Sequence, residues 1–336
     1  MSATILPVKK NHYPVLLQEV ISIISPQNGG TFIDCTFGQG SYSEKILEFS
    51  NTKVIAFDRD AAAIPYSNYL KNKFNKRFTF YNKKFSHLNE LGTNDEIMGI
   101  VFDLGFSQGQ IKDKARGFSF KSQSDLNMKM GLNDFSASDA IQNLNQVSLE
   151  KIFKYFGEEK KSKIISKEIV KERIIKTLDT QDLVRIINKH IKNKRNKRDP
   201  STKIFQALRM FVNQEISELI NGLKNSCDII SRNGIIATVS FHSIEDKICK
   251  HVFNSLSKKN DISRYLPEVN KQTKNFELIT KKAIKPSLNE ISKNPASRSA
   301  KLRAIKKINN QEFTKINFNK FNYLKEIDDL KNKLWD

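Results

Sequence analysis

The chain has 336 residues, enough to bury a sizeable core in one large domain or two. Its 57 lysines and arginines exceed its 36 acidic residues, so the formal net charge is +21. Such an excess favours a polyanionic partner, nucleic acid first, although lysine-rich compositional drift would give the same total. No apolar run reaches the roughly 20 residues that cross a bilayer, so no membrane partner is expected.

The three cysteines, Cys35, Cys227 and Cys249, have neither metal-ligand spacing nor even pairing. The N-terminal residues lack the apolar core of a signal peptide. We therefore expect a cytoplasmic protein that uses no metal.

Short apolar strands alternate with helices in the first part of the chain and again near its end. This rhythm predicts an α/β fold with a largely parallel sheet that helices cover on both faces. The expected strands are 31–35, 53–57, 77–81, 99–103, 234–240, 276–280 and 300–305.

Between residues 107 and 200 the pattern is helical and strongly charged, with no expected strand. This block predicts an inserted all-helical domain, 107–200, within a discontinuous α/β domain made of 1–106 and 201–310. A single helix is expected from about residue 201 to residue 223. The remaining 311–336 form a C-terminal tail with helical spacing, either a docking or homodimerising helix or one more packed helix.

A glycine loop follows the first strand. Gly38 and Gly40 would let the backbone approach a bound nucleotide closely. Asp58 ends the second strand, where a carboxylate can accept both ribose hydroxyls of an adenosine. The pair predicts an adenosine-containing cofactor, although the loop is not the full dinucleotide fingerprint and a turn without ligand would have the same residues.

Two further segments fall at the same expected edge of the sheet. Asp103 ends the fourth strand and suits a planar, amine-bearing substrate, although it could simply cap the local turn. His242 follows the fifth strand, where a structural histidine and a substrate contact both remain open. Ser243 and Asp246 have the spacing of a capping box for the next helix.

A basic run lies near the end of the helical block. It predicts a phosphate-contacting patch, with a solvated helix end as the alternative. Its members are Lys189, Lys192, Lys194, Arg195, Lys197 and Arg198.

Several longer motifs occur in a fixed order along the chain. Together they resemble the bacterial 16S rRNA (cytosine-N4)-methyltransferase family of the MraW type, over about residues 12–303. The motifs are HYPVLL from His12, DCTFGQG from Asp34, FDRD from Phe57, DLG from Asp103, RGFSF from Arg116, YFGEE from Tyr155, FQALR from Phe205, SFHSIED from Ser240 and NPASRSAKLR from Asn294.

The resemblance implies a class I (Rossmann-like) methyltransferase sheet with an inserted substrate-recognition domain. It implies methyl transfer from S-adenosylmethionine to N4 of a cytidine in the decoding centre of 16S rRNA, with the small ribosomal subunit as partner. Carried over by motif, the cofactor contacts would be Ser41, Tyr42, Ser43, Asp58, Phe85, Asp103 and Gln110, and the candidate catalytic residues Asp103, Asn127 and His242.

The chain departs from the family pattern in three places. Ser41-Tyr42 replaces the usual Gly-His, so a specific histidine contact would be lost. Gly109 replaces a proline beside Gln110. Asn127 replaces an acid, so that acid's role as a proton acceptor cannot be assumed, although the amide carbonyl can still accept a hydrogen bond.

The chemistry favours direct in-line attack by the exocyclic amine, because methylation at the ring carbon C5 would need a cysteine nucleophile. Three alternatives stay open. They are the same pocket acting on another RNA or on DNA, an NAD-binding oxidoreductase, and a non-catalytic RNA-binding factor in ribosome assembly.

Overall fold

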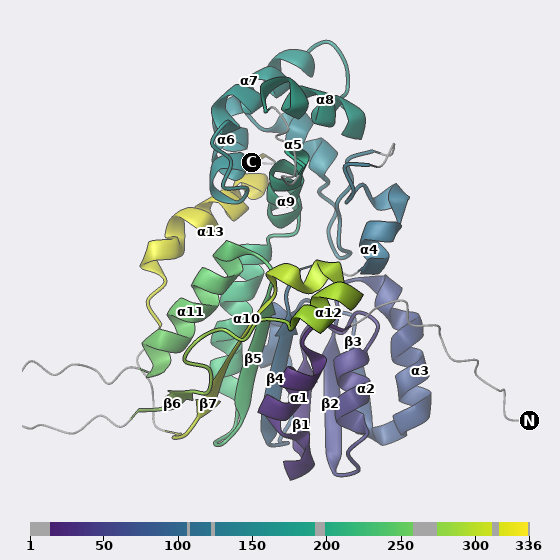
Figure 1. Cartoon of the computed structure of the whole chain (residues 1–336), viewed down its shortest axis with the longest axis vertical. Coiled ribbons are helices and arrows are strands. Elements are labelled where there is room, and N and C mark those ends of the chain that lie inside the picture. Colours follow the sequence, from purple (N-terminus) through teal and green to yellow (C-terminus); the bar gives the residue numbers. More distant parts are fainter. Residues whose placement is uncertain are drawn as a thin grey trace, which may run out of the picture. The chain divides into compact units, whose positions relative to one another are not determined.

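The computed structural model of the protein describes residues 14–105, 108–121, 125–191, 199–257, 274–310 and 316–334 (Figure 1). The chain divides into two compact units. The first unit is Met1–Gly105 with Leu219–Asn317, and the second is Phe106–Glu218 with Phe318–Asp336.

The first unit holds a seven-stranded sheet in the order β3-β2-β1-β4-β5-β7-β6. The pairs among β1 to β5 are parallel, whereas β7 runs antiparallel to both β5 and β6. This strand order confirms the predicted class I (Rossmann-like) α/β fold. The strands are β1 Gly30–Asp34, β2 Thr52–Phe57, β3 Phe78–Tyr81, β4 Ile97–Asp103, β5 Ile235–Ser240, β6 Phe276–Leu278 and β7 Lys301–Lys307.

Alternate side chains of the central strands point to opposite faces of this sheet, and both faces are buried. Phe32, Val54 and Val101 lie in one cluster with residues of three helices, α1, α2 and α3. On the opposite face the ring of Phe102 lies close to Gly222 of α10. The helices with residues in this unit are α1 Leu17–Ile24, α2 Ser41–Leu47, α3 Ile64–Phe74, α10 Glu215–Ile229, α11 Ser243–Ser257 and α12 Leu288–Lys293.

The regular elements of the second unit are all helices, and its described residues contain no strand. Its core is built from the apolar stripes of α6 to α9, including Phe153, Ile169, Ile186 and Leu208, all fully buried. The helices are α4 Gln108–Lys112, α5 Ala137–Asn143, α6 Gln146–Tyr155, α7 Ser162–Glu172, α8 Thr180–His190, α9 Ser201–Val212 and α13 Asn322–Asp328.

The expected single helix over 201–223 is wrong. The structure has two helices, α9 and α10, because Gln214 takes a positive φ of 50° and breaks the helical path. Asn213 stabilises the break: its Nδ2 donates to the carbonyl of Met128, and its Oδ1 accepts from the Met130 backbone N–H, both at 2.8 Å.

The unit boundaries also differ from the expected domain boundaries. Helix α9 groups with the second unit, where it packs on α5, α6 and α8, so the return to the first unit falls near residue 219 rather than 201.

The C-terminal tail contains a helix, α13, that packs within the second unit. Leu324 and Ile327 are buried, and Asp328 Oδ2 accepts from the Ser217 backbone N–H at 2.8 Å. A homodimer stays a prediction.

Within the described ranges, no helix combines the length and the apolarity that crossing a membrane requires. The same ranges contain no group of three or more histidine, cysteine and acidic residues arranged to hold a metal ion.

One ion-pair cluster ties α11 to the sheet and can be tested by stability. Asp246 accepts from Lys301 Nζ at 2.8 Å and from Arg303 Nε at 2.7 Å, both on β7. Burial alone would raise the pKa of Asp246, but the two cationic donors lower it overall. The contribution to stability is therefore present above the ordinary aspartate pKa and is lost as the pH falls through the lowered value.

Asp246→Asn should lower the free energy of unfolding by about 2 kcal/mol, because two partly buried cations lose their counter-charge. Urea denaturation near neutral pH measures the loss. Glu48→Gln is the matched control, because Glu48 pairs with Lys45 on the exposed surface and such pairs contribute less than about 1 kcal/mol. Equal losses in the two variants would contradict the role of Asp246.

Candidate active site

The carboxyl ends of three neighbouring parallel strands, β1, β2 and β4, lie at one edge of the sheet and carry three acids. Asp34 ends β1 in register with Val101 of β4, and Asp103 ends β4 in register with Val239 of β5. Asp58 directly follows β2, the other neighbour of β1. Ligands of open α/β sheets bind outside this edge.

The glycine loop between β1 and α2 leaves open space over its backbone. Gly38 has φ of +53°, and the nearest atom to an added Cβ would be the Thr36 carbonyl oxygen at 4.0 Å. Gly40, with φ of +72°, has no such space, because a Cβ would lie 2.6 Å from the Phe37 ring. Gly40 therefore meets a packing need, whereas Gly38 leaves room for a bound group to approach the main chain.

Asp58 is held in place by the backbone around it. Its Oδ2 accepts from the Gly38 N–H at 2.7 Å, and its Oδ1 accepts from the Asp60 N–H at 2.8 Å. Burial outweighs these hydrogen bonds and raises the pKa of Asp58 to about 6. Each carboxylate oxygen has lone pairs beyond these bonds, so the group can still accept from hydroxyls of a ligand.

Asp34 is fully buried and organises the start of α2. Its Oδ1 accepts from the Thr36 N–H at 3.2 Å, and its Oδ2 accepts from the Ser43 hydroxyl at 2.7 Å. The Ser43 side chain is thus engaged with Asp34, so any contact of Ser43 with a ligand would come from its backbone. Ser41, Tyr42 and Ser43 form the first turn of α2, where N–H groups lack partners within the helix.

Tyr42 points into the core. Its ring is buried and its hydroxyl donates to the Val15 carbonyl, so the side chain stabilises the packing of the N-terminal segment. Burial raises the pKa of the Tyr42 hydroxyl, and the nearby charges of Asp103 and Asp34 raise it further. Only the backbone of Tyr42 remains for the expected cofactor contact.

Phe85 lies beyond the end of β3 and is partly exposed. Its ring meets the Phe102 ring edge-on, with centroids 5.3 Å apart, and would collide with any side chain at position 222. Phe85 is therefore fixed beside the strand that carries Asp103, a place where an apolar surface can receive a planar ring.

Asp103 combines a raised pKa with a buried carboxylate oxygen that is unpartnered within the described ranges. Its Oδ1 is buried and has no hydrogen-bond partner among the described residues, while its backbone N–H donates to Thr36 Oγ1 at 2.7 Å. Burial raises the pKa of Asp103 well above the ordinary value, and the charges of Asp34 and Glu245 raise it further. Buried acceptors without a partner are costly, so the unmatched Oδ1 at this edge makes Asp103 a candidate for contact with a ligand.

His242 occupies the expected strand-to-helix switch, but the predicted capping box is wrong. Helix α11 begins one residue after His242, so the capping role shifts from Ser243 to His242, whose Nδ1 accepts from the Ile244 N–H at 3.3 Å. Glu245, rather than Asp246, reaches back and accepts from the His242 N–H at 3.0 Å. The Ser243 hydroxyl is buried and finds no partner among the described residues.

Two expected site residues lie in the second unit. Gln110 is on the short helix α4. Asn127 uses its side-chain oxygen locally, accepting from the Lys129 N–H at 3.1 Å in a turn that Gly117 approaches closely. Asn127 thus acts as a turn residue in this unit.

The basic run predicted to contact phosphates is only partly within the described residues. Lys192, Lys194, Arg195, Lys197 and Arg198 lie outside them. Lys189 is described, and it is not a free cation, because its Nζ pairs with Glu168 at 2.5 Å.

Asp34 and Glu245 were missed as site residues. Both act through Asp103 by raising its pKa. A signal was present for Asp34, because it ends its strand as Asp103 does. No signal was present for Glu245, because its spacing from His242 matters only once the start of α11 is known.

The MraW methylase family model matches residues 9–308. The chain belongs to the MraW methylase family. This membership confirms the resemblance found in the sequence, and with it S-adenosylmethionine as the cofactor.

Curated relatives agree over nearly their full length. The chain is 40% identical to "Ribosomal RNA small subunit methyltransferase H" of Orientia tsutsugamushi (strain Ikeda), over 89% of this chain and 98% of the relative. It is 39% identical to the protein of the same name in Anaplasma phagocytophilum (strain HZ), over 88% of this chain and 99% of the relative.

Solved structures show weaker likeness. An rRNA methylase from Streptococcus thermophilus has a TM-score of 0.36 and 10% identity, covering 90% of this chain and 100% of that chain. A SAM-dependent O-methyltransferase from Thermotoga maritima has a TM-score of 0.38 and 10% identity, covering 91% and 69%. TM-scores this low do not identify a fold, so the fold assignment is based on the strand order of the sheet.

The residues at the edge fit the cofactor of this family. Asp58 can accept from ribose hydroxyls, the open backbone at Gly38 leaves room for the donor, and the buried Oδ1 of Asp103 lacks a partner. We therefore expect the acceptors at this edge to contact the adenosine of the cofactor and the substrate.

Asp58 makes the cofactor affinity depend on pH. Because the pKa of Asp58 is raised to about 6, folding favours its protonated form, and that contribution to stability is lost as the pH rises through 6. The ribose needs the ionised form. We therefore expect the affinity for S-adenosylmethionine to fall about tenfold for each pH unit below about 6 and to be constant above.

Isothermal titration calorimetry over this pH range measures the effect. Proton release on binding near pH 6 is the second expected signature, since the ligand favours the ionised carboxylate. Asp58→Asn should bind weakly at every pH. A pH-dependent affinity that persists in this variant would show that another group titrates.

Proposed function

We propose that the protein transfers a methyl group from S-adenosylmethionine to N4 of a cytidine in 16S rRNA of the small ribosomal subunit. The relatives' printed name supports the ribosomal substrate. The net charge of +21 supports a polyanionic partner. The acceptor on Asp103 supports an amine as the group that is methylated.

The observation that carries the proposal is the buried, unmatched Oδ1 of Asp103 at the carboxyl edge. An exocyclic amine brings two N–H donors to such an acceptor. The cytosine amine is a poor nucleophile in its ground state, because its lone pair is delocalised into the ring. An acceptor that favours a more tetrahedral nitrogen counters this delocalisation.

S-adenosylmethionine supplies an activated methyl group on a sulfonium, a good leaving group. Asp103 then has two tasks on the substrate side. It orients the amine for in-line attack, and it accepts the proton that the nitrogen loses as the new carbon–nitrogen bond forms. The raised pKa suits the second task, because an ionised carboxylate of raised pKa is a stronger base than an ordinary aspartate.

The cysteines support attack by nitrogen rather than methylation at C5. All three are buried. Burial raises the pKa of the Cys249 thiol to about 12 and also raises the pKa of the Cys227 thiol, so neither is a ready thiolate. A C5 mechanism would require an accessible thiolate nucleophile.

The remaining assignments follow from the same proposal. The first unit holds the cofactor, and the helical second unit recognises the substrate. The contact of Gln110 with the cofactor stays a prediction. Asn127 and His242 are weaker catalytic candidates than Asp103, because each already accepts a hydrogen bond from its own backbone neighbourhood. A ribosomal substrate implies a cytoplasmic location, which we include in the proposal.

The reaction product tests the function directly. After incubation of the protein with unmethylated small subunits and S-adenosylmethionine, mass mapping of 16S rRNA should show one added methyl group on a cytidine, with the fragmentation of N4-methylcytidine. Naked 16S rRNA and duplex DNA serve as parallel substrates. A methyl group at C5, or transfer to DNA alone, would contradict the proposal.

Asp103→Asn tests the catalytic role. The amide keeps the shape but cannot take the proton, so we expect kcat to fall by about 10²- to 10⁴-fold. The melting temperature and the calorimetric affinity for S-adenosylmethionine separate loss of chemistry from loss of folding or binding. Turnover at the wild-type rate would remove Asp103 from the mechanism.

A further inference from the structure

Helix α7 separates its charges by face. Lys163, Lys167 and Lys171 are spaced four residues apart, so they form one row along the helix with steps of about 6 Å. All three are exposed, whereas Ile165 and Ile169 on the other side are fully buried. We call this row the α7 lysine ridge.

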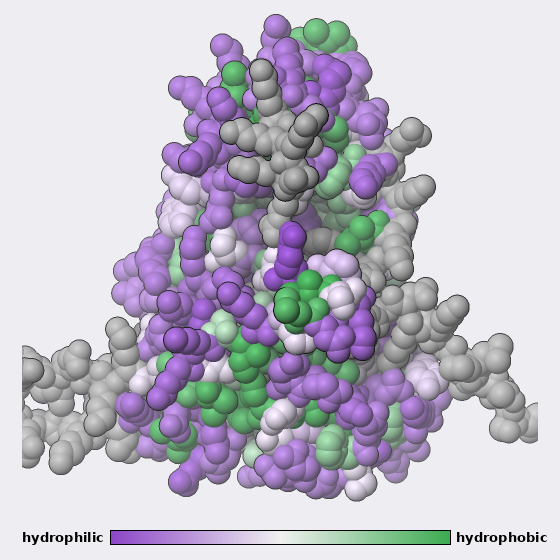
Figure 2. All heavy atoms as spheres, viewed as in Figure 1, coloured by the Kyte–Doolittle hydropathy of each residue, from purple (hydrophilic) through white to green (hydrophobic). Residues whose placement is uncertain are grey.

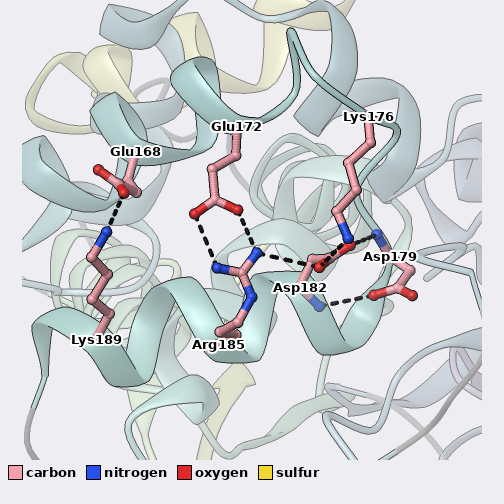
Figure 3. A network of polar contacts seen from close by, with 7 residues as sticks. All are labelled: Glu168, Glu172, Lys176, Asp179, Asp182, Arg185 and Lys189. Carbon is pink, nitrogen blue, oxygen red and sulfur yellow. Dashed lines mark hydrogen bonds and ion pairs between the residues drawn. The ribbon is translucent and has the colours of Figure 1, made fainter.

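The acids of α7 do not neutralise the ridge, because they face α8 (Figure 3). Glu172 is bound by both terminal nitrogens of Arg185, and Glu168 pairs with Lys189. The side chains of Glu168 and Glu172 are only 16% and 17% exposed, so these pairs lie against the protein. Arg185 and Lys189 of α8 are therefore both ion-paired within the second unit.

The ridge lysines, by contrast, have no ion-pair partner among the described residues. Lys171 lies one turn beyond Glu168 and helps to lower the pKa of that carboxyl, but the hydrogen bond from Lys189 is the larger cause. Lys160 and Lys161, just before the helix, are also exposed and extend the positive surface. The surface over α6 and α7 is mostly hydrophilic in Figure 2.

We propose that the α7 lysine ridge is a docking surface for the sugar-phosphate backbone of the RNA substrate. The inference rests on the proposed function and names the partner surface for it. Lysines spaced evenly along one row, with the neighbouring acids paired to α8, match a chain of phosphates. Each ammonium is a compact point charge that contacts phosphate without reading sequence. A merely solvated helix face would be expected to intersperse both signs of charge.

The ridge also revises the electrostatic expectation for this unit. Of the predicted run, Lys189 is engaged by Glu168. Binding RNA through Lys189 would first break that pair, whereas the ridge is available without rearrangement. The ridge lysines therefore affect the affinity for RNA and its salt dependence, whereas Asp103 affects the methyl-transfer step.

The test is a variant with Lys163→Gln, Lys167→Gln and Lys171→Gln. Glutamine keeps helix propensity close to that of lysine while removing the charge. Binding to 16S rRNA is measured by filter retention over a range of salt concentrations. We expect affinity to fall about 10- to 100-fold and the slope of log K against log salt to become shallower by about 2, the value for three lost phosphate contacts on single-stranded RNA.

Two controls match the variant. Lys71→Gln, Lys76→Gln and Lys250→Gln remove the same charge from exposed lysines of the first unit and should leave the slope unchanged. Replacement of the three ridge lysines by arginine should restore both affinity and slope. An unchanged slope in the glutamine variant, or an equal change in the first-unit control, would overturn the proposal.

Anionic vesicles of phosphatidylserine supply the competing partner. If vesicle binding depends on the ridge lysines while rRNA binding does not, the proposal that the ridge docks RNA is also overturned.

The ridge proposal and the proposed methyltransferase function can fail separately. Wild-type methylation of 16S rRNA with an unchanged salt slope in the variant refutes the ridge alone, whereas a ridge-dependent slope without N4-methylcytidine refutes the proposed function alone.

Discussion

The structure depends on holding several carboxylates together at one edge of a parallel sheet. Asp34, Asp58 and Asp103 lie at the ends of neighbouring strands, where the charge of Asp34 raises the pKa of both Asp58 and Asp103. The protein offsets part of this effect with backbone donors from the glycine loop and with the Ser43 hydroxyl. What remains is a buried acceptor on Asp103 that a substrate amine can satisfy.

A different electrostatic arrangement operates in the helical unit. Acids and cations between α7 and α8 neutralise each other, and uncompensated lysines are left on the solvent face of α7. The first unit thus concentrates carboxylates where we propose that a cationic sulfonium and an amine react. The second unit presents positive charge suited to a phosphate backbone. Each unit is matched in sign to what we propose it binds.

Strand positions and the site edge could be predicted from the sequence because short apolar runs and strand-ending acids are local signals. Asp58 and Asp103 were found in this way. Other features depend on three-dimensional packing. The break at Gln214 follows from hydrogen bonds of Asn213 to residues more than 80 positions away. The burial of Tyr42 follows from the N-terminal segment, and the pairing of Lys189 from the approach of α7.

A crystal structure of the protein with S-adenosylhomocysteine tests the central claim most directly. The account predicts that both ribose hydroxyls lie within hydrogen-bond distance of Asp58, with the homocysteine sulfur on the side of the edge that Asp103 faces. Ligand bound away from the carboxyl ends of β1, β2 and β4, or side chains filling the space over Gly38, would contradict it.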